Sequence, residues 1–159
     1  MTQPTARCLI LACGNTLRSD DGVGPFLASW AEERFASDPS IRVLSRMQWT
    51  PELAEDLARA ETALFLDCST HSAPGQVLLF PVEPAPGEPR LFTHHLGAPE
   101  LLALARDLYG SLPRIAQILT VGGSYLELGE KFSPLVQAAL PEAHRLLEEA
   151  VQACLARPA

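Results

Sequence analysis

Five short segments of this chain are apolar through most of their length, and segments with a helical pattern separate most of them. The five are Arg7–Ala12, Ile41–Leu44, Thr62–Leu66, Gln76–Phe80 and Ile115–Val121. A strand with one face in water alternates apolar and polar residues, whereas a strand covered on both faces does not. The pattern therefore predicts an α/β fold, with a mostly parallel sheet of about five strands and helices on both faces.

The segments between these strands carry apolar residues at helical spacing. They cover residues 23–35, residues 53–58, Pro99–Tyr109 and the stretch that follows Ser133-Pro134. Thr50 and Ser133 each stand before a proline, which is typical of an N-cap followed by the first turn of a helix. Pro141 lies inside the last pattern, and we expect it to break or kink that helix.

Size, charge and cysteine usage narrow the class of protein. The chain has 159 residues, which suits one domain over residues 1–159, and 12 Lys and Arg against 19 Asp and Glu give a formal charge of −7. An acidic chain without a basic cluster is a poor candidate for nucleic acid or an anionic membrane. It has no apolar run of about 20 residues and no C-x-x-C pair. We expect reduced thiols and a cytoplasmic protein.

The loop after the first predicted strand contains three glycines and the adjacent acids Asp20 and Asp21. Helix capping is one interpretation, with Ser19 or Asp20 as the N-cap and Asp21 in the first turn. A phosphate-binding loop is a poorer one, because the segment lacks the Lys-Ser/Thr of a Walker motif and its acids would repel phosphate.

Two further loops carry residues that can bind a metal. Asp67 directly follows the apolar segment Thr62–Leu66, and the alternative for it is capping of the next turn. His94 and His95 stand before a predicted helix, where a surface or capping role is the alternative. Two carboxylates and an imidazole that meet at one edge of the sheet would suit a divalent transition metal. Two cysteines flank this region, Cys13 and Cys68. They are either additional soft metal ligands or small buried apolar side chains.

The order of these motifs resembles one known family over nearly the whole chain. The stretch LILACGN from Leu9 to Asn15, followed by Leu17, Asp20-Asp21-Gly22 and Gly24, is similar to the opening signature of the hydrogenase maturation endopeptidases. These enzymes process the large subunit of nickel–iron hydrogenases. The resemblance continues through Asp67, His94-His95-Leu96-Gly97 and Val121-Gly122. It implies a three-layer α/β/α sandwich with a twisted sheet.

The resemblance also implies a function and a site. The protein would be an endopeptidase that cleaves the C-terminal extension from a hydrogenase large-subunit precursor already loaded with nickel. Asp21, Asp67 and His94 would bind that nickel, whereas Asp20 would hold the loop or cap the helix. The nickel would come with the precursor, so no tightly bound cofactor of the enzyme's own is expected. The partner would be that precursor, with no nucleic acid and no membrane involved.

This chain departs from the family pattern at two places. Asp21 stands where many members have Glu, so the carboxylate is one methylene shorter. A segment with Gln48 and Trp49 replaces a glycine-rich stretch after the second strand. These two residues and Asn15 are candidates for contacting the precursor, and packing is the alternative for Trp49.

Two other functions stay open at this point. One is a nickel chaperone or docking protein that cleaves nothing. The other is an autonomous zinc- or manganese-dependent amidohydrolase that acts without a hydrogenase partner.

Overall fold

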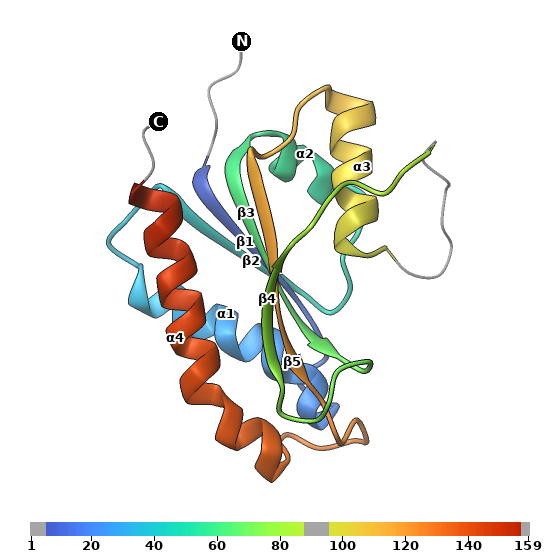
Figure 1. Cartoon of the computed structure of the whole chain (residues 1–159), viewed down its shortest axis with the longest axis vertical. Coiled ribbons are helices and arrows are strands. Elements are labelled where there is room, and N and C mark those ends of the chain that lie inside the picture. The colour runs from blue at the N-terminus through green and yellow to red at the C-terminus, as the bar shows by residue number, and fades with distance from the viewer. Residues whose placement is uncertain (1–5, 88–95, 157–159) are drawn as a thin grey trace.

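The computed structural model describes residues 6–87 and 96–156 (Figure 1). Within them the chain forms five strands, four α-helices and a short 3-10 helix at Ser19–Gly22. The strands are β1 (Ala6–Cys13), β2 (Ile41–Arg46), β3 (Ala60–Ser69), β4 (Val77–Pro81) and β5 (Ile115–Gly122). The α-helices are α1 (Val23–Arg34), α2 (Leu53–Ala58), α3 (Ala98–Tyr109) and α4 (Pro134–Ala156).

The strands form one sheet in the order β2-β1-β3-β5-β4. The pairs β1–β2, β1–β3 and β3–β5 are parallel, and β4 runs antiparallel to β5 at the edge. Helices α1 and α4 lie on one side of the sheet, and α2 and α3 lie on the other (Figure 1). The predicted three-layer α/β/α fold with a mostly parallel sheet is therefore confirmed.

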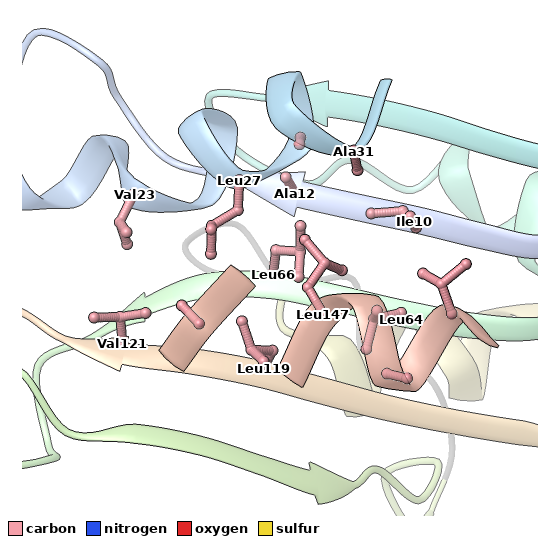
Figure 2. Close-up of a cluster of buried hydrophobic side chains, with 14 of the residues drawn as sticks. Ile10, Ala12, Val23, Leu27, Ala31, Leu64, Leu66, Leu119, Val121 and Leu147 are labelled. Carbon is pink, nitrogen blue, oxygen red and sulfur yellow. The ribbon is translucent and has the colours of Figure 1, made fainter. Parts of the chain in front are cut away.

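Each face of the sheet has its own apolar core. Figure 2 shows the core under α1 and α4, where Ile10, Leu66 and Leu119 from three neighbouring strands meet Leu27 and Leu147 from the two helices. The residues between them in sequence point to the opposite face, because side chains alternate along a strand. That second core lies under α2 and α3 and includes buried residues such as Leu11 and Phe65.

The order of the strands defines where a site is expected. From β1 the chain passes through α1 to β2 on one side, and from β2 it passes through α2 to β3 on the other side of β1. The two helices therefore lie on opposite faces, and the topological switch point falls between the carboxyl ends of β1 and β3. In open α/β sheets, ligands bind outside the carboxyl ends of the strands at such a switch point.

Of the break or kink expected at Pro141, the break is wrong, because α4 runs from Pro134 to Ala156 as one helix. Pro141 is exposed, while Leu140 just before it and Ala143 just after it are buried in the core under α1 and α4. Burial on both sides of the proline holds the helix together despite the missing backbone donor.

In the described part of the chain, none of the helices has the length and apolar character needed to span a bilayer.

Candidate functional site

Glycines allow the loop after β1 to fold back against the ends of the strands. Gly14 has a φ of +149°, and a Cβ there would collide with the backbone oxygen of Asp21. At Gly24, a Cβ would lie 2.5 Å from the carbonyl oxygen of Cys13 and 2.9 Å from that of Leu66. These close approaches bring the start of α1 onto the carboxyl ends of β1 and β3, with the two acids of the loop beside them.

Asp20 holds three distant parts of the chain together. Its carboxylate is buried and accepts hydrogen bonds from the backbone N–H groups of Ser124 (2.9 Å), Tyr125 (2.9 Å) and Ser133 (2.7 Å), and from the Ser133 hydroxyl (2.8 Å). Burial opposes ionisation of Asp20, but these hydrogen bonds outweigh it and lower the pKa of the carboxyl. The expectation that Asp20 holds the loop is confirmed.

Helix capping by this segment is not observed. Neither the 3-10 helix nor α1 has a side-chain hydrogen bond at its N-cap. The Ser19 hydroxyl instead donates to the carbonyl oxygen of Glu127 at 2.8 Å. The capping interpretation of Ser19 and Asp20 is therefore wrong, because both side chains are used to attach this loop to the loop after β5.

Asp21 lies at the surface of the same loop and is half-buried. Its Oδ2 accepts a hydrogen bond from the backbone N–H of Asn15 at 2.8 Å. The Asn15 side chain in turn accepts from the backbone N–H of Leu17 at 2.9 Å, so this amide shapes the turn that holds Asp21. The Asp21 carboxylate can accept further hydrogen bonds or bind a cation, since each carboxylate oxygen can accept two hydrogen bonds.

Asp67 lies within β3 and does not follow it, because the strand continues to Ser69. Its Oδ1 accepts a hydrogen bond from the backbone N–H of Cys68 at 2.8 Å. The turn after the strand is capped by Ser69, whose hydroxyl oxygen accepts from the N–H groups of His71 (3.2 Å) and Ser72 (3.1 Å). Ser69 thus has the capping role that was the alternative for Asp67.

Asp67 has a polar neighbour on each adjacent strand. The β3–β5 register pairs Asp67 with Thr120, and the β1–β3 register that pairs Ala12 with Leu66 places Cys13 beside Asp67. All three side chains point away from the core of Figure 2 and toward the face covered by α2 and α3. Burial raises the pKa of the Cys13 thiol, and the charge of Asp67 and a hydrogen bond with its carboxylate raise it further.

Cys68 belongs to the opposite face but lies close to the same acids. Burial raises the pKa of its thiol to about 12, with further contributions from the negative charges of Asp21, Asp67 and Asp20. Asp21 also raises the pKa of Cys13, so both predicted carboxylates act on the same two thiols. Cys13 packs against the core under α2 and α3, and Cys68 is buried in the core under α1 and α4, which favours the role of small apolar side chains over that of soft metal ligands.

The histidine of the predicted site lies outside the described residues. His94 and His95 precede α3, whose N-cap is Gly97. Within residues 6–87 and 96–156, no group of three or more His, Cys, Asp or Glu side chains is arranged to hold a metal ion. The structure thus places two of the three predicted ligands, Asp21 and Asp67, at the switch-point edge of the sheet.

The two candidates after β2 have different surroundings. Gln48 is exposed, whereas Trp49 is 7% exposed and packs its ring against that of Phe65, with the centroids 5.2 Å apart. The burial of Trp49 favours the packing alternative. Its Nε1 is buried and has no hydrogen-bond partner among the described residues, and the same is true of Oγ1 of Thr120. Thr120 was not singled out from the sequence, although a hydroxyl in an otherwise apolar strand end was the available signal.

A cavity of about 240 Å³ lies elsewhere in the molecule. Its lining residues come from the segment after β4, from α3 and from the amino end of β5, among them Pro84, Leu102 and Arg114. The cavity lies at the amino end of β5, whereas Asp67 lies near the carboxyl end of the parallel strand β3. The cavity and the candidate site are therefore at opposite ends of the strands.

Known proteins resemble this chain over most of its length. No protein-family model matches it. The hydrogenase 2 maturation protease of Escherichia coli (strain K12) is 27% identical to it over 144 residues, which are 86% of this chain and 85% of that protein. A hydrogenase 2 maturation peptidase from a Thaumarchaeota archaeon has a solved structure with a TM-score of 0.65 and 26% identity, covering 92% of this chain and 98% of that one. The chain is similar to the hydrogenase maturation endopeptidases in sequence and in fold.

The fold of these endopeptidases agrees with the one described above. The hydrogenase maturating endopeptidase HybD from E. coli superposes with a TM-score of 0.72 at 22% identity and covers 92% of each chain. The resemblance to the hydrogenase maturation endopeptidases that the motifs predicted is therefore confirmed.

Proposed function

We propose that this chain is an endopeptidase that removes the C-terminal extension from a nickel-loaded precursor of a nickel–iron hydrogenase large subunit. The observation that carries the proposal is the position of Asp21 and Asp67, two carboxylates beside the β1–β3 switch point. The names of its relatives, which are hydrogenase maturation proteases, support the same activity.

In this proposal the nickel is part of the substrate. Asp21 and Asp67, together with His94, bind the nickel that the precursor carries. Carboxylate and imidazole groups suit a divalent transition metal of this kind, and three protein ligands leave positions for the precursor's own groups. A precursor without nickel lacks the group that these residues recognise, so metal loading is checked before cleavage.

The chemistry of the cleavage follows from these ligands in one of two ways. The metal can polarise the carbonyl group of the peptide bond that is cut. Alternatively, the metal positions that bond and one of the carboxylates acts as general base toward water. Asp21 suits the second role, because it is half-buried and, among the described residues, its carboxylate accepts a hydrogen bond from the backbone N–H of Asn15 through one of its two oxygens.

We place this activity in the cytoplasm. None of the four cysteines, Cys8, Cys13, Cys68 and Cys154, is part of a disulfide bond in the structure, which supports a reducing compartment. The large-subunit precursor is the partner of this proposal.

The decisive experiment incubates the purified chain with nickel-loaded precursor and measures the precursor's mass. We expect a loss of the C-terminal extension with the wild-type chain. Asp21→Asn, Asp67→Asn and His94→Ala should each stop cleavage while the circular dichroism spectrum and Tm stay close to wild type. Glu130→Gln, which removes an exposed carboxylate from the loop after β5, should cleave normally and serves as the matched control.

The other outcomes separate the rival functions. Nickel binding without any shortened precursor would indicate a nickel chaperone. Stoichiometric zinc or manganese in the isolated protein, with amide hydrolysis in the absence of precursor, would indicate an autonomous hydrolase. A precursor prepared without nickel should stay intact, and cleavage of that precursor at the wild-type rate would remove the metal check from the proposal.

A further inference from the structure

A polar row crosses three neighbouring strands at the candidate site. Cys13 on β1, Asp67 on β3 and Thr120 on β5 lie side by side on the face covered by α2 and α3. The row before it on this face consists of the apolar side chains Leu11, Phe65 and Ile118. A row of three hydrogen-bonding groups in such a surface needs a physical reason.

The Thr120 hydroxyl is the unusual member of the row. Thr120 is 7% exposed, and its Oγ1 is buried and has no hydrogen-bond partner in the part of the chain that the structure describes. Burying a hydroxyl without a partner destabilises the folded state. A valine at this position would fill the same space without that cost, so packing does not account for the hydroxyl.

Asp67 is the carboxylate that this hydroxyl can reach. The two residues are register partners on adjacent parallel strands, which run about 4.8 Å apart, and their side chains share a face. A threonine hydroxyl is aimed by one torsion angle, χ1, so a change of rotamer can turn it toward the neighbouring strand. The other neighbour, Cys13, already forms a hydrogen bond with the Asp67 carboxylate from β1.

We propose that Thr120 is a positioning residue for Asp67, whose carboxylate it orients by a hydrogen bond when that carboxylate binds the nickel of the precursor. This inference rests on the proposed role of Asp67. Carboxylates that bind metals are themselves held by hydrogen bonds, and the loss of such a partner typically lowers metal affinity or activity about 10- to 100-fold. Thr120 and Cys13 would hold Asp67 from the strands on its two sides.

The test uses Thr120→Val, which keeps the shape and removes the hydroxyl. If Thr120 positions Asp67, kcat/KM for the nickel-loaded precursor falls about 10- to 100-fold, and the Kd for Ni²⁺ alone, measured by calorimetry, rises by a similar factor. The Tm should stay the same or rise, because the variant removes a buried hydroxyl that lacks a partner. Stability and activity would thus move in opposite directions.

Two further variants make the result specific. Thr120→Ser keeps the hydroxyl and should restore most of the kcat/KM and of the Ni²⁺ affinity. Thr62→Val is the matched control, because Thr62 is a buried strand threonine whose hydroxyl donates to the carbonyl oxygen of Arg7 at 2.6 Å, at the far end of β3. It should lower the Tm and leave the kcat/KM of the folded protein at the wild-type value.

Each outcome decides between the two proposals. Wild-type kcat/KM and wild-type Ni²⁺ affinity in Thr120→Val would overturn the positioning role while leaving the protease function intact. If the wild-type chain cleaves no precursor, the proposed function fails, and a weaker Ni²⁺ affinity of Thr120→Val would still support the inference. A wild-type chain that neither cleaves precursor nor binds Ni²⁺ would overturn both.

Discussion

At the scale of single residues, Asp20 and Asp21 are neighbours with opposite surroundings. Asp20 is fully buried and its carboxylate accepts hydrogen bonds from Ser124, Tyr125 and Ser133. Asp21 is half-buried at the edge of the sheet and accepts from the backbone of the adjacent Asn15. Two aspartates that are adjacent in sequence thus have different roles: Asp20 holds the loop, and Asp21 is available to a ligand.

This contrast predicts different effects of the same substitution. Asp20→Asn replaces one accepting oxygen by an NH₂ group that faces donors, so the free energy of unfolding in urea should fall by about 2–3 kcal/mol. Asp21→Asn should change it by less than about 1 kcal/mol, because the carboxylate is partly exposed and its recorded hydrogen bond can be kept. Equal losses in the two variants would contradict the assignment of Asp20 to structure and Asp21 to the site.

The sequence alone could not divide these roles between the two acids. Capping was the interpretation that local spacing favoured for Asp20, and the resemblance to the family was needed to single out Asp21. The partners of Asp20 lie more than 100 residues further along the chain. Local patterns contain no information on contacts of that range. Thr120 was missed for the same reason, because its neighbour Asp67 is known only from the pairing of β3 with β5.

At the scale of elements, α4 shows how tertiary packing can override a local signal. Pro141 has no N–H to complete the helical ladder, and its ring disfavours the helical geometry of the preceding turn. The helix nevertheless continues, because buried residues on both sides, such as Leu140 and Leu147, pack in the core with α1.

Replacing this proline should therefore stabilise the protein. Pro141→Ala restores a helical hydrogen bond at an exposed position, which outweighs the lost rigidity of the unfolded chain and should raise the free energy of unfolding by about 1–2 kcal/mol. Chemical denaturation measures the change. Precursor cleavage should stay at the wild-type rate, since α4 contributes none of the candidate site residues. A variant less stable than the wild type would show that Pro141 serves the packing of α4.

Strand β3 is longer than its apolar run, because its backbone hydrogen bonds to β5 continue past the last apolar residue of that run. The apolar run Thr62–Leu66 predicted the middle of the strand correctly, but the ladder with β5 extends to the pair Ser69 and Gly122. The last residues are polar, so their strand conformation depends on a partner that periodicity does not reveal. Asp67 was expected after the strand and lies within it, which is why its side chain has defined neighbours on both sides.

At the scale of the whole molecule, the half-buried His144 and the buried Asp20 contribute to the dependence of stability on pH. The His144 ring lies 4.8 Å from the ring of Trp30, and burial lowers the pKa of its imidazole. The unfolded chain then binds this proton more readily, so stability should fall as the pH drops below about 6.5, the ordinary histidine value. The lowered pKa of Asp20 adds stability above about 3.9 that is lost at lower pH.

Urea denaturation across the range from neutral to acidic pH checks both contributions. His144→Phe should flatten the decline that begins near pH 6.5. Asp20→Asn should leave that decline in place and flatten the one below about pH 4. A wild-type slope retained below pH 6.5 in His144→Phe would show that other groups cause the decline.

The fold of the molecule was more predictable than its site. Five apolar strands separated by helical patterns are enough to indicate a covered parallel sheet. The strand order and the antiparallel β4 were not accessible, because they depend on long-range pairing. For the site, the rule that loops after parallel strands meet at one edge brought Asp21 and Asp67 together, whereas His94 falls outside the described residues and stays a prediction.

The hydrogen bonds of Asp20 also bear on how the protein is made. During synthesis the loop that carries Asp21 leaves the ribosome early, but its partners at Ser124, Tyr125 and Ser133 emerge more than 100 residues later. Until then, strands β1, β2 and β3 can begin to associate, while the loop has no anchor. A nascent or prematurely terminated chain that ends before residue 123 would therefore lack an organised site. The edge that carries the candidate site takes shape only when the last quarter of the polypeptide has been synthesised.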